Sequence, residues 1–228
     1  MTEKQRPYVI IAIDGPSGAG KSTAARRLAC LLGYRYVDSG ALYRAVGWLV
    51  RAQALPLEDP GAIVACLQRT PIDLTFPDGT LQVRVAGQCV TSQLRSEAVA
   101  RAASTVATMP GVRQVITAQL RQLGCEADVV MEGRDIGTAV FPDATVKFFL
   151  DALPTVRGQR RLQEMQQGGD TATLGQVVEA MAQRDSQDRA RATAPLVQSP
   201  EAQTIDTTDL TVDEVIQTML SEIRRALP

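Results

Sequence analysis

The fold of this chain is decided by residues 8–32, which read YVIIAID, GPSGAGKS and TAARRLACLL in succession. The apolar run Val9–Ile13 does not alternate with polar residues, which is typical of a strand buried on both faces of a parallel sheet. The glycine-rich segment Gly15–Ser22 fits G-x-x-x-x-G-K-[ST] at every fixed position. From Lys21 to Leu32 the apolar residues recur at helical spacing. A strand, this loop and a helix in that order predict a phosphate-binding loop.

The loop predicts a site for the triphosphate of ATP. Its glycines let backbone N–H groups turn toward the phosphates, and the start of the helix adds a positive dipole end. We expect Lys21 to contact the β- and γ-phosphates and Ser22 to be the protein ligand of Mg²⁺. A chance glycine-rich turn is the alternative, and the flanking strand and helix disfavour it. The expected ATP-binding residues are Gly15, Pro16, Ser17, Gly18, Ala19, Gly20, Lys21, Ser22 and Thr23.

The composition favours small ligands over polymers. With 228 residues, 45% of them hydrophobic, the chain can bury a full core. The net charge of −1 supplies no field that would attract a nucleic-acid polymer or an anionic membrane. The longest apolar runs are far below the roughly 18 residues of a membrane helix. Residues 1–7 lack the apolar region of a secretory signal, so we expect a cytoplasmic protein.

Two residue types are missing, and each absence excludes a class of site. There is no histidine, which removes imidazole acid–base catalysis and histidine-ligated metals. There is no asparagine either, so the guanine-binding Asn-Lys-x-Asp motif of regulatory GTPases is impossible. The four cysteines form no Cys-x-x-Cys pair, and we expect reduced thiols rather than a zinc site. The expected chemistry therefore uses arginine, lysine and carboxylates.

The rest of the chain repeats the alternation of strands and helices. Further strands are expected at Tyr34–Val37, Val129–Met131, Thr145–Leu150 and Thr204–Ile205. Such alternation is typical of an α/β fold with a central parallel sheet flanked by helices. The last helix is expected to begin at Thr211, with Glu214 completing its capping box.

One region departs from this alternation. Ile72–Phe76 and Leu81–Val85 alternate around Pro77-Asp78-Gly79-Thr80, which predicts a β-hairpin, and Cys89-Val90 adds a third strand. We therefore expect a small antiparallel β insertion over residues 62–103 in a P-loop core of residues 1–61 and 104–228.

An arginine-bearing helix followed by the polar, glycine-rich residues 166–170 predicts a short lid over about residues 157–170. Its arginines are Arg157, Arg160 and Arg161. Gly158 lies inside this helix, where glycine costs about 1 kcal/mol relative to alanine. We therefore expect the helix to be locally loose.

Three charged clusters are candidates for ligand binding. Asp38–Arg44 and Glu132–Thr138 each follow a strand, so they lie at the carboxyl edge of the sheet, where ligands of open α/β folds bind. The structural alternatives are a helix-capping turn at Asp38 and an internal Arg134–Asp135 ion pair. In the third cluster, residues 184–191, charges recur at helical spacing, and a solvated, salt-bridged face is the default interpretation.

Together these motifs resemble the bacterial cytidylate kinases, members of the P-loop nucleoside monophosphate kinases, over nearly the whole chain. The resemblance includes the phosphate-binding loop, Asp38-Ser-Gly-Ala-x-Tyr-Arg44 and Glu132-Gly-Arg-Asp-Ile-Gly-Thr138 running to Phe141-Pro-Asp-Ala144. It continues through Arg157-x-x-Arg160-Arg161, Asp188-Arg-x-Arg191, Ala194-Pro-Leu196 and Asp206-Thr-Thr208.

The resemblance implies roles for particular residues. The insertion would belong to the monophosphate-binding region, and Lys21, Arg160 and Arg161 would act on the transferring phosphoryl group. Arg44, Arg134 and Arg191 would hold the acceptor phosphate. The remaining CMP-binding residues would be Ser39, Ser104, Arg113 and Asp135 around the cytosine, with Arg184 and Asp188 at the ribose.

The implied reaction is transfer of the γ-phosphoryl group of ATP to CMP, and to dCMP, with Mg²⁺. We take a monomer as the default expectation. A phosphate acceptor is already ionised, so the absence of histidine is no obstacle. A carboxylate such as Asp135 can accept from the exocyclic amine of cytosine, whereas uracil presents an oxygen there. Two alternatives stay open: a kinase for another nucleoside monophosphate, and a non-catalytic ATP-gated regulator. The regulator would have no use for Arg44, Arg134 and Arg191.

Overall fold

The structure is a computed structural model that describes residues 8–77, 80–167 and 171–227. Two parts of the sequence predictions lie outside these described residues. They are Asp78-Gly79, at the centre of the expected hairpin turn, and Gly168–Asp170, at the end of the expected lid.

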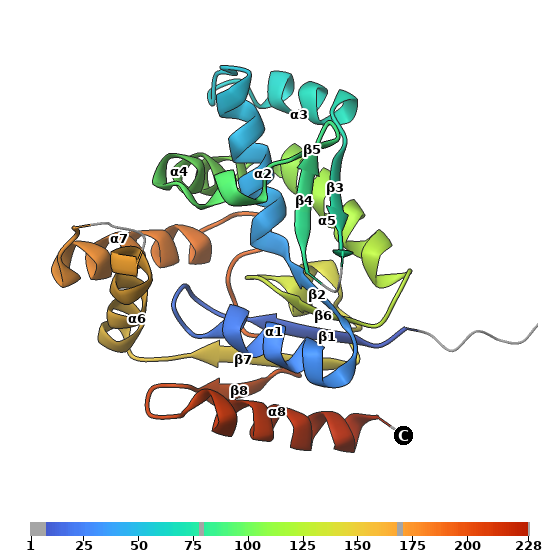
Figure 1. Cartoon of the computed structure of the whole chain (residues 1–228), viewed down its shortest axis with the longest axis vertical. Coiled ribbons are helices and arrows are strands. Elements are labelled where there is room, and N and C mark those ends of the chain that lie inside the picture. The colour runs from blue at the N-terminus through green and yellow to red at the C-terminus, as the bar shows by residue number, and fades with distance from the viewer. Residues whose placement is uncertain (1–7, 78–79, 168–170, 228) are drawn as a thin grey trace, which may run out of the picture. The chain divides into compact units, whose positions relative to one another are not determined.

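Strands and helices alternate along most of the described chain (Figure 1). The strands are β1 (Ile10–Asp14), β2 (Arg35–Asp38), β3 (Ile72–Thr75), β4 (Gln82–Val85), β5 (Gln88–Cys89), β6 (Val129–Glu132), β7 (Val146–Asp151) and β8 (Gln203–Asp206). The α-helices are α1 (Lys21–Leu32), α2 (Ser39–Ala52), α3 (Pro60–Arg69), α4 (Glu97–Val106), α5 (Pro110–Gly124), α6 (Pro154–Gln167), α7 (Leu174–Arg189) and α8 (Val212–Ala226). A 3₁₀ turn, η2 (Thr91–Arg95), and a π-helical turn, η3 (Ile136–Val140), complete them.

The central sheet confirms the predicted α/β fold. Within the described residues it has five strands in the order β2-β6-β1-β7-β8. β1 pairs in parallel with β7, Ile11 lying opposite Val146, and β7 pairs in parallel with β8, Phe148 lying opposite Gln203. All five residues of β1 are buried, which agrees with the continuous apolar run in the sequence.

The chain forms two compact units, and the smaller sheet belongs to the unit that contains Arg35–Val129. Here β3 and β4 pair antiparallel, with Ile72 opposite Val85, and β5 adds to β4. The predicted hairpin and third strand are therefore confirmed. Helix α2 packs on α4, and α3 packs on α5.

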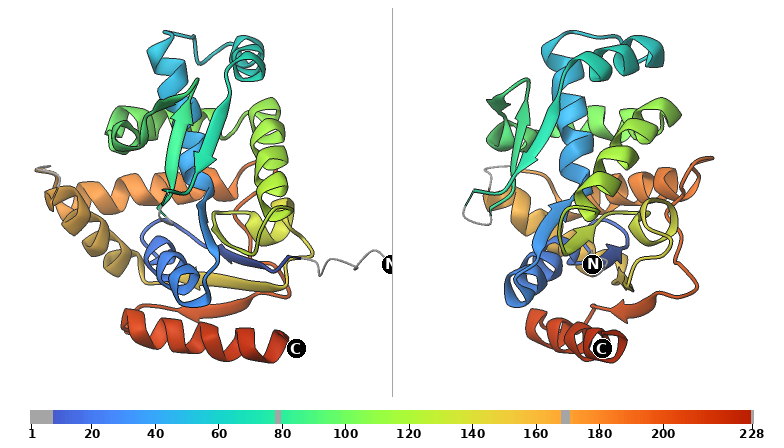
Figure 2. Two further views of the ribbon diagram at one scale, coloured as in Figure 1. Left: turned by 45° about the vertical axis from the view of Figure 1, so that its right-hand side comes forward. Right: turned by 90° about the vertical axis from the view of Figure 1, so that its right-hand side faces the viewer.

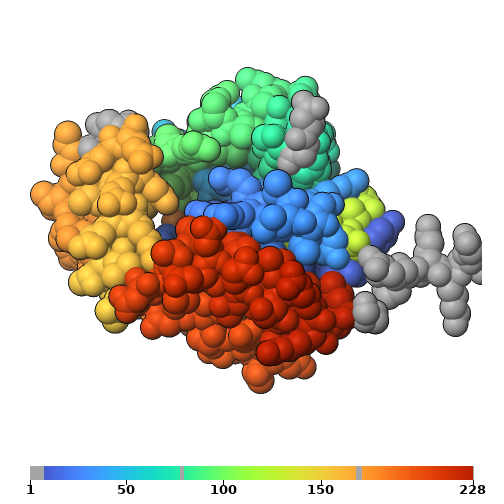
Figure 3. Space-filling model, turned by 60° about the horizontal axis from the view of Figure 1, so that its bottom comes forward, coloured from blue at the N-terminus to red at the C-terminus, as the bar shows by residue number. Residues whose placement is uncertain are grey.

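The other unit contains Val9–Tyr34 and the chain from Val130 onward. In it α1 packs against β1 and α8, and α8 also packs against β7 (Figure 2). Helix α8 forms an outer surface of this unit, coloured red in Figure 3. It begins as predicted: Thr211 and Glu214 form a reciprocal capping box, with Glu214 Oε2 accepting from Thr211 N at 2.8 Å.

Helix α6 is continuous through Gly158. A Cβ built on Gly158 would lie 2.4 Å from Cγ2 of Val178 on α7. Glycine is therefore required because α6 and α7 approach closely at this point.

Candidate active site

The phosphate-binding loop lies between β1 and α1, as its sequence predicts. Gly15 has a φ of 144°, and a Cβ there would come within 2.0 Å of the Leu150 carbonyl oxygen. Only glycine fits this position, because both the backbone conformation and the space exclude a side chain. Gly20 is the N-cap of α1. The loop therefore ends at a helix N-terminus, which is suited to binding phosphate.

Lys21 is a buried cation on the first turn of α1. Its side chain folds back over the loop, and Nζ donates a hydrogen bond to the Pro16 carbonyl oxygen at 2.6 Å. Burial, followed by the nearby Arg134 guanidinium, lowers the pKa of Lys21 to about 7, although Glu132, Asp14 and Asp185 oppose this shift. A phosphate group bound beside Lys21 would supply a negative charge that favours the protonated form of its side chain.

Asp14, directly before the loop, is a buried carboxylate that the sequence predictions missed. Its Oδ1 accepts from Ile136 N at 2.8 Å and its Oδ2 from Gly137 N at 2.7 Å. Burial raises the pKa of Asp14 to about 6, although these two hydrogen bonds lower it. The carboxylate thus joins the end of β1 to the start of η3. An acid at the end of an apolar strand was the available signal.

Three of the predicted acceptor-site residues form one cluster. Asp188, on α7, is 1% exposed; its Oδ2 accepts from Arg134 Nε at 2.9 Å, and its Oδ1 pairs with Arg191 Nη2. Arg191 is 8% exposed, and its buried Nε has no hydrogen-bond partner among the residues that the structure describes. The cluster can therefore offer donors to an anion.

This cluster corrects one of the structural alternatives. The charges of residues 184–191 do not form a wholly solvated face, because Asp185 and Asp188 are both 1% exposed. Arg134 pairs with Asp188, which lies on another element. The periodicity of charge cannot reveal which side of a helix is covered by other elements.

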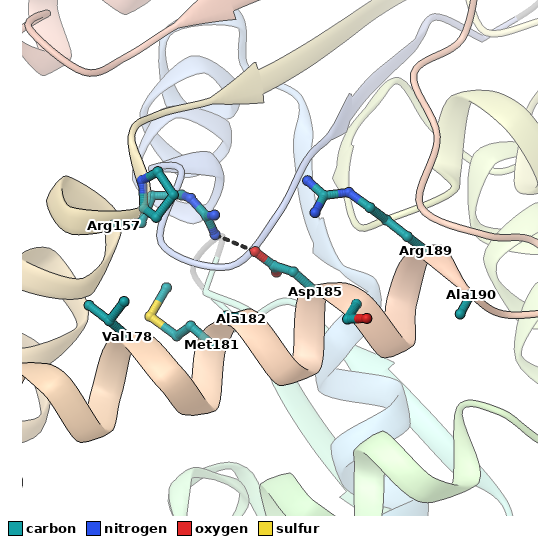
Figure 4. A pocket seen from close by; sticks show the side chains of 9 residues that line it. Arg157, Val178, Met181, Ala182, Asp185, Arg189 and Ala190 are labelled. Carbon is teal, nitrogen blue, oxygen red and sulfur yellow. Dashed lines mark hydrogen bonds and ion pairs between the residues drawn. The ribbon is translucent and has the colours of Figure 1, made fainter.

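Asp185 lies one turn before Asp188 and forms a second buried pair, with Arg157 of α6. Arg157 Nη1 lies 2.5 Å from Asp185 Oδ2, and Figure 4 shows the two side chains pointing toward one another. A cleft of about 450 Å³ lies beside this pair. Its lining residues are Pro154, Arg157, Val178, Met181, Ala182, Asp185, Ser186, Arg189 and Ala190. The sequence predictions had Arg157 as a lid residue and gave Asp185 no specific role.

The two predicted catalytic arginines have different surroundings. Arg160 donates to Thr207, from Nη1 to Oγ1 at 2.9 Å and from Nη2 to the carbonyl oxygen at 2.6 Å. The Thr207 hydroxyl also lies 3.1 Å from the Ala19 carbonyl oxygen, so Arg160 connects through Thr207 to the phosphate-binding loop. Arg161 is half-exposed and pairs with Glu164 at 3.0 Å.

The remaining predicted site residues divide between the two units. Ser39, Arg44, Ser104 and Arg113 lie in the unit of Arg35–Val129, whereas Asp135 and Arg184 lie in the other. Asp38 caps α2, with Oδ1 accepting from Ala41 N at 3.1 Å, so the predicted capping role is confirmed. The same carboxylate accepts from Arg44 Nη2 at 2.6 Å.

The other residues of this set differ in how far they are buried. Ser39 and Asp135 are buried, and Ser104 and Arg184 are half-buried. Arg113 is buried, donates to the Ala107 carbonyl oxygen at 3.1 Å, and lies over the Tyr43 ring at 5.6 Å.

Among the residues described, no group of three or more histidine, cysteine or acidic side chains could hold a metal ion. Ser22 is exposed on the first turn of α1, beside the loop. A single hydroxyl there fits Mg²⁺, which keeps several waters and binds mainly through substrate phosphates. None of the described helices is both long enough and apolar enough to cross a membrane.

Comparison with known sequences points to one family. A family model described as Cytidylate kinase matches residues 11–225. The chain is 40% identical over 219 residues to the cytidylate kinase of Citrifermentans bemidjiense, covering 96% of this chain and 94% of that protein. It is 42% identical over 217 residues to the cytidylate kinase of Caldanaerobacter subterraneus subsp. tengcongensis, covering 95% of each.

Comparison with solved structures supports the fold. A gluconokinase from Sinorhizobium meliloti aligns with a TM-score of 0.50 and 13% identity, over 97% of this chain and 94% of that one. An uncharacterized protein from Eubacterium ventriosum aligns with a TM-score of 0.55 and 11% identity, over 95% of this chain and 98% of that one.

Proposed function

We propose that this chain, which belongs to the cytidylate kinase family, transfers the γ-phosphoryl group of ATP to CMP, and to dCMP, giving ADP and the corresponding diphosphate. The observation that carries the proposal is the cluster of Arg134 and Arg191 around the buried carboxylate of Asp188, in the same compact unit as the phosphate-binding loop. A triphosphate site alone would suit many proteins. A second set of phosphate-binding arginines suits a protein with two phosphorylated substrates.

The donor half would consist of Gly15–Thr23. The loop N–H groups and the start of α1 would bind the phosphates of ATP, and Lys21 would exchange its bond with the Pro16 carbonyl oxygen for the β- and γ-phosphates. Because Lys21 is already buried, its charge would act in a site of low dielectric.

We assign the metal of this kinase as Mg²⁺, with Ser22 as its protein ligand. The metal, when bound, neutralises charge on the phosphates. The residues of the chain would do the rest: bind both nucleotides, align them and neutralise the transferred group through Lys21, Arg160 and Arg161.

The acceptor half would use Arg44, Arg134 and Arg191 for the phosphate of CMP. The unpartnered Nε of Arg191 supports this, since a buried guanidinium donor without a partner is costly unless a ligand satisfies it. Asp188 orients two of these arginines from the protein side, and with Arg184 it would lie at the ribose. No general base is required, because the attacking phosphate oxygen is already ionised.

Base selection would fall to Asp135, Ser39, Ser104 and Arg113. A carboxylate at Asp135 would accept from the exocyclic amine of cytosine and would repel the oxygen that uracil presents there. Sites built to hydrogen-bond a group reject an analogue that lacks it by large factors. The burial of Asp135 supports a role in recognition, because solvent would weaken this contact.

The same proposal includes the setting of the enzyme. We place it in the cytoplasm, which is supported by its four free cysteines, all within the described residues. We also propose that it acts as a monomer.

The proposal is tested by measuring ADP formation from Mg-ATP with CMP, dCMP, UMP, AMP and GMP in parallel. We expect turnover with CMP and dCMP well above that with the other acceptors. Equal or faster turnover with AMP or GMP would contradict the assignment of the acceptor. ADP formation that does not depend on any acceptor would favour a regulator.

The base pocket has a test of its own. The Asp135→Ala variant should lose most of its kcat/KM for CMP while its affinity for ATP changes little. An equal loss for both substrates would show that Asp135 is not a base-recognition residue.

A further inference from the structure

Arg157 connects three parts of its compact unit. Its Nε donates to the Ala152 carbonyl oxygen, just after β7, at 3.1 Å. Its Nη1 donates to the carbonyl oxygen of Ser17, at the tip of the phosphate-binding loop, at 2.9 Å, and pairs with Asp185 on α7. The side chain is only 7% exposed, so solvent screens these contacts little.

Asp185 also contacts the backbone of Ser17. While Oδ2 pairs with Arg157, Oδ1 accepts from Ser17 N at 3.4 Å. The backbone of Ser17 thus has its carbonyl oxygen bound by the arginine and its N–H bound by the carboxylate. One ion pair therefore holds both backbone polar groups of this residue.

The tip of the loop is also in close contact with the same two helices. A Cβ on Gly18 would come within 2.8 Å of the Arg157 carbonyl oxygen and 2.9 Å of Cε of Met181 on α7. The loop has little freedom to move at Gly18 without moving α6 and α7. A loop that binds phosphate through its backbone N–H groups depends on this kind of fixed conformation.

We propose that Arg157 and Asp185 are positioning residues that hold Ser17 and Gly18 of the loop against α6 and α7 and thereby set the affinity for ATP. The inference rests on the proposed function, since it assumes that the loop binds ATP. Neither residue need touch the nucleotide, because both act on the loop through the backbone of Ser17.

The test replaces the pair by apolar side chains, Arg157→Met with Asp185→Leu. A protein usually stays folded when a buried ion pair is replaced by apolar residues of similar volume. Removal of only one partner leaves the other charge buried and unpaired. The dissociation constant of Mg-ATP is measured by calorimetry, and the KM values for ATP and CMP are measured separately. We expect the ATP constant to rise about tenfold or more, since charged hydrogen bonds to the loop are lost. The KM for CMP should change by less than about threefold.

A matched control removes an ion pair that is remote from the loop. On α8, Arg225 Nη1 lies 3.3 Å from Glu222 Oε2, and the arginine side chain is 77% exposed. The double change Arg225→Gln with Glu222→Gln should leave ATP affinity and turnover unchanged. If the Arg157→Met, Asp185→Leu protein melts like the wild type and binds ATP as tightly, the pair does not position the loop and the proposal is wrong.

A second variant decides the case in which the apolar pair does not fold. Asp185→Asn keeps the shape of the side chain and leaves Arg157 bonded to Ser17 and Ala152. ATP affinity should then fall by a smaller factor, about threefold. Asp185→Glu should restore part of this affinity. Unchanged ATP affinity in Asp185→Asn would overturn the proposal.

The proposed function and this inference fail in different ways. Wild-type protein that binds ATP but makes no ADP with CMP refutes the proposed reaction, while the calorimetric comparison still tests the pair. Wild-type protein active on CMP, with variants that bind ATP normally, refutes the pair alone.

Discussion

Gly158 on α6 lies against Val178 on α7 so closely that a Cβ on the glycine would stand 2.4 Å from the valine Cγ2. Valine on a helix has one preferred rotamer, so its methyl group cannot simply turn away. The absence of a side chain at Gly158 therefore sets how closely the two helices pack.

Gly158→Ala should destabilise the protein, although alanine favours a helix by about 1 kcal/mol over glycine. Overpacking at such a contact costs about 1–3 kcal/mol, which we expect to exceed that gain. The free energy of unfolding in urea gives the measurement.

The matched test combines Gly158→Ala with Val178→Ala, which removes the obstructing methyl groups. The double variant should be more stable than the Gly158→Ala protein, even though Val178→Ala alone removes apolar contacts. If Gly158→Ala alone raises stability, the helices have room to separate, and the close packing is not a constraint.

ATP binding should be linked to protonation of Lys21. The pKa of this group is about 7, and a triphosphate beside it should raise that pKa well above its present value. At pH 8 the free protein therefore has a mostly neutral lysine, and binding should take up most of one proton. Calorimetry in two buffers of different ionisation enthalpy measures the uptake. Lys21→Met should abolish it, and equal uptake in that variant would assign the proton elsewhere.

As pH rises, the unfolding free energy of the wild type should fall relative to that of the Asp14→Asn variant. Its folded pKa of about 6 lies above its ordinary value of 3.8, so the folded state binds the extra proton between these values. The stabilisation from this proton is fully present below pH 3.8 and is lost as pH rises through 6. Asparagine does not titrate.

The measurement is the difference in unfolding free energy between the wild type and Asp14→Asn at pH 4.5 and 7.5. This difference should decline by about 2 kcal/mol over that interval. The asparagine cannot accept from both Ile136 N and Gly137 N, but that loss is the same at each pH. A difference that stays constant with pH would mean that Asp14 is ionised throughout.

Arg191→Lys should damage the use of CMP selectively. Lysine keeps the positive charge but cannot present the planar set of donors that grips phosphate in two places. We expect kcat/KM for CMP to fall about tenfold or more, with ATP affinity changed by less than about twofold. Arg225→Lys on exposed α8 is the control and should behave like the wild type. Equal losses for ATP and CMP would remove Arg191 from the acceptor site.

Much of the fold could be predicted because its signals are local. The run of apolar residues before Gly15 specifies β1, the loop motif fixes the start of α1, and Thr211 with Glu214 fixes the start of α8. Each depends on neighbouring residues along the chain. The family resemblance then supplied the roles of the site residues, which remain proposals here.

The parts that could not be predicted depend on what covers an element. Asp185 and Asp188 resemble a surface pattern in the sequence, yet both are buried by arginines from other elements. Gly158 resembles a weak point in a helix, and only the position of Val178 shows why it is needed. Contacts between segments far apart in sequence leave no local periodicity.

Asp185 and Asp188 are three residues apart on one helix, which separates them by about 4.5 Å along its axis. The first is connected to the phosphate-binding loop through Arg157, and the second to Arg134 and Arg191, the proposed acceptor arginines. Because α7 is one continuous helix, a displacement of the whole helix on ligand binding would move both carboxylates. The two nucleotides should therefore bind cooperatively through α7, and thermodynamic reciprocity requires each to change the affinity of the other by the same factor, whichever arrives first.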